Sequence, residues 1–256
     1  MISLKQRISE KWAHLNKLDT LRLEVTEHCN LKCVHCFVGH RETCQFFHTQ
    51  FSVAELVEIV REAKNLGAFK VVITGGEPLM YPGLSELCQK IKKMNFMLVI
   101  YTNGTLINDR VTRFLARIGV NMVLVSNYGT KKNYYENTTR VPGSYSKFKK
   151  GIASLKKRNI PFKQQTVLLK TNEKNRKQLW EVCKPRVDFR INVSKKHSLY
   201  PQKYRPGNQA VKDIMHFFIT SHPRKKVIPV LLKNKNQTSR YAPWVLPNWW
   251  WRLMVR

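Results

Sequence analysis

The sequence predicts an α/β fold in which helices cover a parallel sheet that is either closed or open. Two hydrophobic periods alternate between residues 21 and 195, where each strand-like run is followed by a stripe of apolar residues at helical spacing. About six strand-then-helix units follow one another in this way, which is typical of parallel sheets. Apolar residues make up 43% of the chain and charged residues 24%, as in globular domains, so wholesale disorder is excluded.

The individual elements follow from this alternation. Ser52 and Glu55 form the capping box of the first core helix, which is expected to end at Gly67. The expected strands are Leu21–Val25, Val71–Thr74, Met97–Tyr101, Met122–Ser126, Gln165–Leu169 and Phe189–Val193. The helical stripes lie at residues 56–63, 84–91, 111–118, 148–155 and 179–183. In closed and open sheets alike, functional residues gather at the carboxyl ends of the strands.

Two flanking segments differ from this core. Residues 1–17 are predicted to form an amphipathic helix with Ile8, Trp12 and Leu15 on one side. Residues 196–256 lack the alternation, with no glycine after Gly207 and no acidic residue after Asp213. We therefore divide the chain into an N-terminal helix (1–17), a core (18–195) and an irregular C-terminal extension (196–256).

The chain is strongly basic, with 46 Lys and Arg against 16 Asp and Glu and a net charge of +30. Such a charge attracts anions, but the basic residues form scattered pairs, so a nucleic-acid partner is compatible with the sequence and is not favoured. No run of apolar residues is long enough to span a membrane, and the N-terminus lacks the apolar region of a secretion signal. A cytoplasmic location is therefore expected.

Three of the six cysteines lie close together directly after the first predicted strand. Cys29, Cys33 and Cys36 have the spacing C-x3-C-x2-C, so that one loop can supply three thiolates to an iron–sulfur cluster. Structural zinc is the alternative and needs a fourth ligand, for which the local candidates are His35, His40, Cys44 and His48. Cys44 is interpreted as a free surface thiol. Cys88 and Cys183 lie on apolar helical stripes and are expected in the core.

Two further motifs follow the next strands. Gly-Gly-Glu-Pro occupies residues 75–78 after the second strand, and Thr-Asn-Gly-Thr occupies residues 102–105 after the third. The order and placement of these motifs and of the cysteine loop resemble the radical SAM superfamily over residues 18–195. This resemblance implies a partial (β/α)6 barrel, similar to a TIM barrel. It also implies a [4Fe-4S] cluster ligated by Cys29, Cys33 and Cys36, with S-adenosylmethionine (SAM) on the fourth iron.

The resemblance also implies the reaction class and a cofactor site. Reductive cleavage of SAM would give a 5′-deoxyadenosyl radical, which would abstract a hydrogen atom from the substrate. Glu77 would lie near the SAM ammonium, Gly75 and Gly76 near its methionine part, and Ser126 and Asn127 near the ribose, although an acidic residue common there in related enzymes is absent. The implied cofactor-binding residues are Gly75, Gly76, Glu77, Pro78, Asn103, Ser126 and Asn127. His35 is interpreted as packing around the cluster.

Within the superfamily the motifs are most similar to the peptide and protein maturases that carry a cysteine-rich SPASM extension. This branch implies a peptide or protein substrate and a reductant such as a flavodoxin or ferredoxin. RNA-modifying and small-molecule enzymes remain alternatives, as does an inactive remnant that binds zinc or an iron–sulfur cluster.

The C-terminal extension departs from the maturase pattern, because no cysteine follows Cys183. We interpret it as an out-of-frame, poorly ordered tail. A reading frame shifted by one base somewhere between about Asp213 and Tyr241 would give Cys-x2-Gly-x3-Leu-Val-Val-x3-Gly, provided that Tyr241 has a TAT codon, and this pattern resembles the start of a SPASM domain. A TAC codon at Tyr241 would contradict this interpretation.

Overall fold

The computed structural model describes residues 18–36 and 51–183, together with Tyr204, Pro206, Gly207, Gln209, Ala210 and Asp213. Contacts divide the chain into the units Met1–Pro206 and Gly207–Arg256, and every strand and helix described below belongs to the first. The predicted N-terminal helix, the predicted strand Phe189–Val193, and Cys44, His40 and His48 lie outside the described residues. The same holds for nearly all of the C-terminal extension.

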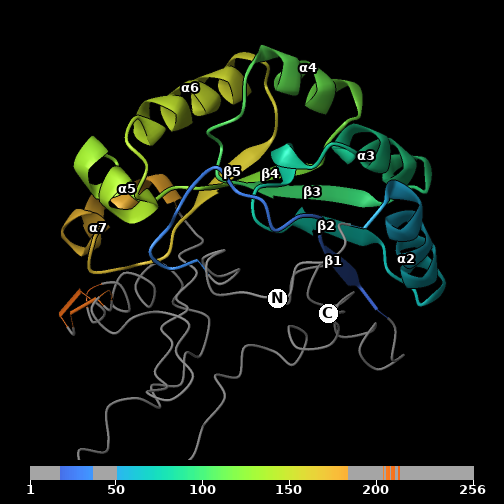
Figure 1. Cartoon of the computed structure of the whole chain (residues 1–256), viewed down its shortest axis with the longest axis horizontal. Helices are drawn as coiled ribbons and strands as arrows, with labels where there is room; N and C mark the ends of the chain where they lie inside the picture. Colours follow the sequence, from blue (N-terminus) through green and yellow to red (C-terminus); the bar gives the residue numbers. More distant parts are fainter. Residues whose placement is uncertain are drawn as a thin grey trace, which may run out of the picture. The chain divides into compact units, whose positions relative to one another are not determined.

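Five parallel strands form one sheet, and their spatial order is their order in the sequence. The strands are β1 (Thr20–Glu24), β2 (Lys70–Thr74), β3 (Met97–Thr102), β4 (Met122–Ser126) and β5 (Phe162–Gln165). All four neighbouring pairs are parallel, so their carboxyl ends lie at one edge of the sheet (Figure 1). The predicted α/β fold with a parallel sheet is therefore confirmed.

Each strand is followed by at least one helix. A long connection separates β1 from its helix, α2. They are α2 (Val53–Asn65), α3 (Leu84–Lys93), α4 (Asp109–Arg117), α5 (Lys132–Thr139), α6 (Ser144–Lys157) and α7 (Arg176–Cys183). Two short 3-10 turns, η1 (Pro78–Met80) and η2 (Glu173–Asn175), lie between them. Helices α2, α3, α4 and α6 follow one another in an arc on one side of the sheet (Figure 1).

The core lies between this arc and the sheet. Alternate strand residues such as Leu23, Ile73 and Ile100 point into it and meet the apolar stripes of the helices, for example Leu56 and Leu87. The intervening residues Val72, Val99 and Leu124 form a separate small cluster with Tyr101 and Met122. The two-residue period thus gives the sheet two apolar faces, as expected for parallel strands covered on both sides.

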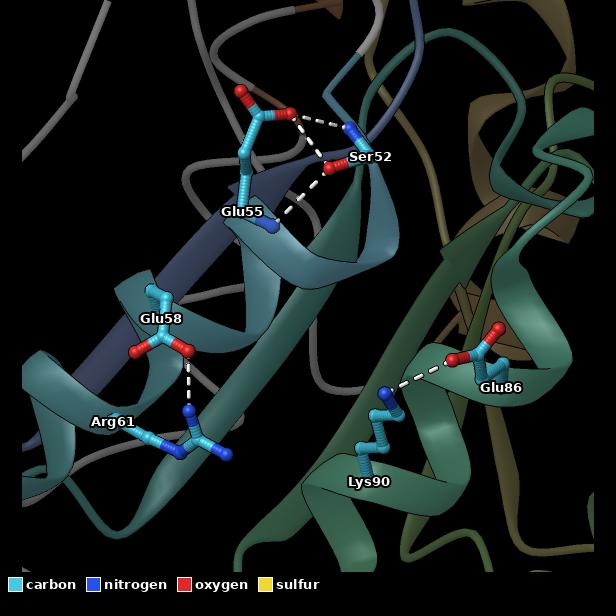
Figure 2. A network of polar contacts seen from close by, with 6 residues as sticks. All are labelled: Ser52, Glu55, Glu58, Arg61, Glu86 and Lys90. Atoms are coloured by element: carbon cyan, nitrogen blue, oxygen red, sulfur yellow. Dashed lines mark hydrogen bonds and ion pairs between the residues drawn. The ribbon is translucent and has the colours of Figure 1, made fainter.

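The capping box at the start of α2 is present as predicted (Figure 2). The Ser52 backbone N–H donates to Glu55 Oε2 at 2.8 Å, and the Glu55 backbone N–H donates to Ser52 Oγ at 3.3 Å. Each side chain therefore satisfies a backbone donor that the helix itself leaves unpaired. Figure 2 also shows two ion pairs on the helix surfaces, Glu58–Arg61 on α2 and Glu86–Lys90 on α3.

Two elements differ from the prediction. The fifth strand is Phe162–Gln165, not Gln165–Leu169, because the polar residues pair with β4 while Leu168 and Leu169 are buried in the turn that follows. Helix α5 was not expected, since it lacks an apolar stripe and its sequence is Lys-Asn-Tyr-Tyr-Glu-Asn-Thr-Thr. Within the described residues, no helix has the length and apolar character needed to cross a membrane.

Candidate active site

The cysteine loop continues from β1 and remains paired with the end of β2. The ladder between these strands extends past their ends, because the Gly76 backbone N–H donates to the Thr26 carbonyl at 2.7 Å and that of Glu77 to the His28 carbonyl at 2.8 Å. The segment that leads into Cys29 is thus held beside the Gly-Gly-Glu-Pro motif, as expected if parallel strands bring both motifs to one edge.

Both glycines of the motif are required by this close approach. A Cβ atom on Gly76 would lie 2.5 Å from the carbonyl oxygens of Glu27 and His28. A Cβ on Gly75 would lie 2.3 Å from the Thr26 carbonyl oxygen, and the positive φ of +130° at Gly75 is itself one that glycine favours. The need for glycine here therefore already follows from backbone packing against the cysteine loop.

The other side of the cysteine loop contacts the end of α5. The Lys32 backbone N–H donates to the Thr139 carbonyl and that of Val34 to the Thr138 carbonyl, each at 3.0 Å. Both threonines are fully buried, and the Thr138 hydroxyl lies 2.6 Å from that of Thr171. The unpredicted helix is therefore part of the site, since its last carbonyl groups hold the loop between Cys29 and Cys36.

The three thiols lie half-buried in this loop and influence one another. Burial raises the pKa of Cys29 and Cys33, and the neighbouring thiolates raise it further. Three adjacent thiolates therefore need a compensating positive charge, which iron ions bound to the sulfurs would supply. This chemistry fits a metal cluster. In residues 18–36 and 51–183, no three His, Cys, Asp or Glu side chains converge as a site for one metal ion would require.

Glu77 is completely buried, and its side chain joins the segment after β2 to the end of β3. Its Oε1 accepts hydrogen bonds from the Thr102 hydroxyl at 2.7 Å and the Leu79 backbone N–H at 3.1 Å, and its Oε2 accepts from the Asn103 backbone N–H at 2.8 Å. Burial raises the pKa of Glu77, and these bonds oppose the rise. A carboxylate offers about four acceptor positions, so one remains for a donor such as an ammonium group.

Asn103 connects the third strand to the cysteine loop. Its Nδ2 donates to Asn30 Oδ1 at 2.9 Å and lies 3.8 Å from the Cys29 sulfur. Asn30 in turn donates to the Thr105 hydroxyl at 2.8 Å. The predicted residues Cys29, Glu77 and Asn103 are thus brought together in one hydrogen-bonded network. Pro78 begins η1 directly beside it and is buried.

Ser126 and Asn127 lie at the carboxyl end of β4, where the sequence placed them. Asn127 is buried, donates through Nδ2 to Gln164 Oε1 at 2.9 Å and accepts from the Gly129 backbone N–H at 3.0 Å. The amide keeps one hydrogen and one lone pair for a ligand. The next residue, Tyr128, was not among the predicted site residues, yet it is buried and its ring contacts His35 in the cysteine loop. A tyrosine directly after the predicted Ser-Asn pair was the one available signal.

Cys88, Cys183 and His35 behave as expected from the sequence. Cys88 and Cys183 are buried on their helices, and burial raises the pKa of each thiol to about 12. Burial also lowers the pKa of His35 to about 4, so its ring is neutral near pH 7. The ring packs edge-on against Tyr128 at a centroid distance of 4.7 Å. Packing beside the cysteines is the role that the sequence predicted for His35.

Comparisons with known proteins are consistent with this geometry. The family model described as the radical SAM superfamily matches residues 23–182. A GTP 3',8-cyclase from Clostridium perfringens (strain SM101 / Type A) is 30% identical over 163 residues, which cover 62% of this chain and 49% of that protein. An AdoMet-dependent heme synthase from Methanosarcina barkeri is 29% identical over 161 residues, covering 63% of this chain and 46% of its own. The chain spans about half the length of the curated relatives it matches.

Solved structures share the fold at low sequence identity. The enzyme anSMEcpe with bound AdoMet matches with a TM-score of 0.55 and 21% identity, covering 64% of this chain and 48% of its own. SuiB of Streptococcus suis bound to the precursor peptide SuiA matches with a TM-score of 0.55 and 21% identity, covering 70% and 40% of the two chains. At these identities the likeness establishes the fold.

Proposed function

The chain belongs to the radical SAM superfamily, and we propose that it is an enzyme of that family whose cluster is held by Cys29, Cys33 and Cys36 and whose substrate is a peptide or protein. Members of this family use a [4Fe-4S] cluster and SAM. A cluster held by these cysteines would supply the electron for reductive cleavage of SAM, and hydrogen abstraction from the substrate by a 5′-deoxyadenosyl radical would follow. The observation that carries the proposal is the cysteine loop, paired at one sheet edge with Gly76 and Glu77.

The roles of the chain's own residues follow from their contacts. Three cysteines can ligate three of the four irons, which leaves one coordination position open for a bound molecule. Glu77 offers its free acceptor position to the SAM ammonium, and Asn103 orients the Cys29 side of the loop. Asn127 offers its remaining hydrogen and lone pair to the ribose, together with the adjacent Ser126 hydroxyl. Gly75 and Gly76 carry no Cβ atom, so the methionine part of SAM can approach the backbone closely. Pro78 begins the η1 turn that follows.

A peptide substrate is supported by the motifs themselves. The segment Thr-Glu-His-Cys-Asn-Leu-Lys-Cys at residues 26–33, and Tyr81-Pro82 after the Gly-Gly-Glu-Pro-Leu segment, resemble the peptide maturases. The fold shared with SuiB, which was solved bound to a precursor peptide, is compatible with this choice. A ferredoxin or flavodoxin is the proposed reductant. The proposed functional core remains residues 18–195.

A second candidate function is favoured by the curated relatives. The names GTP 3',8-cyclase and heme synthase describe enzymes that act on small molecules. This chain matches about half the length of each of them. Incubation with GTP tests this alternative directly. Consumption of GTP with formation of 5′-deoxyadenosine would replace the peptide proposal, whereas mass changes in a peptide library without GTP consumption would support it.

The core proposal is tested by anaerobic reconstitution with iron and sulfide, reduction, addition of SAM and quantification of 5′-deoxyadenosine. We expect about four irons per chain and 5′-deoxyadenosine formation. Cys33→Ala should abolish both, and Cys88→Ala is the matched control, because it removes a buried thiol that belongs to helix α3 and not to the loop. Four bound irons without 5′-deoxyadenosine would indicate an inactive cluster-binding remnant, and zinc in place of iron would refute the cluster.

A further inference from the structure

Three exposed basic residues, Lys32, Arg140 and Lys170, lie where the cysteine loop meets the end of α5. Lys32 belongs to the loop, and its backbone N–H donates to the carbonyl of Thr139, the residue before Arg140. Arg140 Nη2 donates to the Tyr204 hydroxyl at 2.8 Å, and the Tyr204 carbonyl accepts from the Lys170 backbone N–H at 2.9 Å. These contacts bring three residues that are far apart in the sequence into one basic surface.

The carboxylates that the structure describes do not neutralise this basic surface. The two ion pairs of the described residues lie on α2 and α3, and neither includes any of the three basic side chains. Helix α5 has one carboxylate, Glu136, whose Oε1 accepts from the Tyr145 backbone N–H at 3.3 Å. The positive charge of the surface is therefore available to attract an anionic partner.

Arg140 has a backbone conformation that arginine seldom adopts. It caps the carboxyl end of α5 with a φ of +60° and a ψ of +21°, in the left-handed region where glycine or asparagine is usual. Its guanidinium carbon lies 5.7 Å from the centre of the Tyr204 ring, so a cation–π contact adds to the hydrogen bond. A cation is thus fixed at a position where glycine would be less strained, and such strain points to a function.

The basic surface and the proposed SAM site lie on different sides of the cysteine loop. The Gly-Gly-Glu-Pro motif pairs with the residues that lead into Cys29, whereas the end of α5 accepts from the backbone N–H groups of Lys32 and Val34. A substrate has to approach SAM, but an electron donor needs to approach only the cluster. Lys32 precedes Cys33, and neighbouring Cα atoms are about 3.8 Å apart. Because electron transfer slows steeply with distance, the side that faces α5 suits an electron donor.

We propose that Lys32, Arg140 and Lys170 form the docking surface for an acidic electron-transfer protein that reduces the cluster. The carrier is oxidised by one electron, and the oxidised cluster is reduced by that electron. This inference rests on the proposed function, because it requires a cluster at the loop cysteines. Opposite charges steer such carriers to their partners, and electron-transfer interfaces are small, so a few cations beside the cluster suffice.

The first test maps the contact by chemical cross-linking. The reconstituted protein is mixed at low salt with a flavodoxin of net negative charge, and a carbodiimide joins lysine amines to carboxylates that contact them. Peptide mapping should find cross-links at Lys32 and Lys170 in clear excess over Lys150 and Lys157, which are exposed on α6. Cross-links that favour α6, or that are spread evenly over the four lysines, would overturn the inference.

The second test measures the rate at which the same flavodoxin, in its reduced form, reduces the cluster. The triple variant Lys32→Gln, Arg140→Gln and Lys170→Gln should react about tenfold more slowly than the wild type at low salt, because electrostatic steering is lost. The difference should disappear at high salt, which screens exposed charges. Photoreduced deazaflavin, a small neutral reductant, should reduce the clusters of the variant and the wild type at the same rate.

The matched control removes the same charge from the helices that cover the sheet. Arg117→Gln on α4, combined with Lys150→Gln and Lys157→Gln on α6, changes three exposed residues. Flavodoxin should reduce the cluster of this control at close to the wild-type rate. A control as slow as the first triple variant would show that net charge, and not the basic surface, governs the rate.

The outcomes separate this inference from the proposed function. A wild-type protein that binds no cluster overturns both. A cluster that deazaflavin reduces, but that flavodoxin reduces equally fast in the triple variant and the wild type or not at all, overturns the docking surface alone. The same holds if the triple variant loses only peptide modification, because the surface would then bind an acidic substrate. Should the triple variant fail to fold, Lys32→Gln alone should still slow the reaction with flavodoxin, and an unchanged rate would refute the inference.

Discussion

Replacement of Glu77 by glutamine tests whether this buried carboxylate joins the strand ends. Glu77→Gln keeps the shape of the side chain but replaces one acceptor oxygen by an NH2 donor. If Oε2 is replaced, the Asn103 backbone N–H loses its acceptor. If Oε1 is replaced, the Thr102 hydroxyl and the Leu79 backbone N–H lose theirs. A buried donor without a partner costs about 1–3 kcal/mol. For a chain of this size, about 2 kcal/mol lowers Tm by roughly 4–8 °C. Thermal unfolding of the metal-free chain, followed by circular dichroism, measures the change.

The pH dependence of the Glu77→Gln effect adds a second check on the same carboxylate. Burial raises the pKa of Glu77 above its usual value of 4.5. A carboxyl with a raised pKa in the fold contributes stability that is complete below the unfolded pKa and is lost as the pH rises through the folded pKa. The wild type should therefore lose stability relative to Glu77→Gln above pH 4.5, and the difference in Tm should be smaller at pH 8 than at pH 5.

The control for Glu77→Gln is the same change on the surface. Glu55→Gln lies in the capping box of α2, where glutamine can also accept from the Ser52 backbone N–H (Figure 2). Its Tm should match that of the wild type. Equal Tm values for Glu77→Gln and wild type at pH 5, or a difference that widens toward pH 8, would refute the role assigned to Glu77.

Three further experiments test the glycine packing at the cysteine loop, the core position of Cys88, and metal binding by the loop cysteines. Gly76→Ala should lower the free energy of unfolding measured in urea by about 1–3 kcal/mol and reduce the amount of bound iron. The control is Gly119→Ala, whose added Cβ meets nothing within 4 Å. It should cost only about 1 kcal/mol, because of the positive φ at Gly119, and leave the bound iron unchanged. Iodoacetamide at pH 8 should modify Cys88 only after unfolding, because the thiol is buried and burial raises its pKa to about 12. Peptide mapping measures the modification. If Cys88 reacts as fast in the native chain as in the unfolded chain, its position in the core is wrong. Removal of iron by a chelator should lower the Tm of the reconstituted wild type and leave that of Cys33→Ala unchanged, because only a cluster bound to the folded state stabilises it; equal responses would argue against the cysteine site.

Local sequence patterns predicted the parts of the fold that depend on local periodicity. The strands β1 to β4 and the helices α2, α3 and α4 have clear apolar periods, and each was found within a few residues of its predicted place. Strand β5 was placed too late because the apolar residues Leu168 and Leu169 are buried in a turn. That turn is held by Asn172, whose Oδ1 accepts from the Leu169 backbone N–H at 2.8 Å.

Helix α5 could not be predicted, because packing and not propensity determines it. Its residues are mostly poor helix formers, and its burial depends on Tyr135, Thr138 and Thr139, which do not form an apolar stripe. Tyr135 packs against Phe148 at a centroid distance of 4.8 Å. Such a contact between neighbouring helices leaves no periodic signal in the sequence of α5.

The candidate site shows the same division between local and long-range information. The cysteine spacing and the Gly-Gly-Glu-Pro segment are local patterns, and the parallel order of β1, β2 and β3 brings them to one edge without further assumptions. The contacts that hold them there join distant residues, such as Glu77 with Asn103 and Val34 with Thr138. No single segment encodes these pairs, so they became visible only in the folded chain.

The cysteine loop is therefore a product of the whole sheet and not of its motif alone. One side of the loop depends on β2 through Gly76 and Glu77, and the other depends on α5 through the carbonyl groups of Thr138 and Thr139. A C-x3-C-x2-C segment in an unfolded chain would present the same thiols without these backbone partners. Because the loop backbone is held from both sides before any metal binds, the conformational entropy lost on cluster binding is smaller than for a free peptide. Substitutions in α5, far from the cysteines in sequence, should for this reason weaken cluster binding as well as the fold.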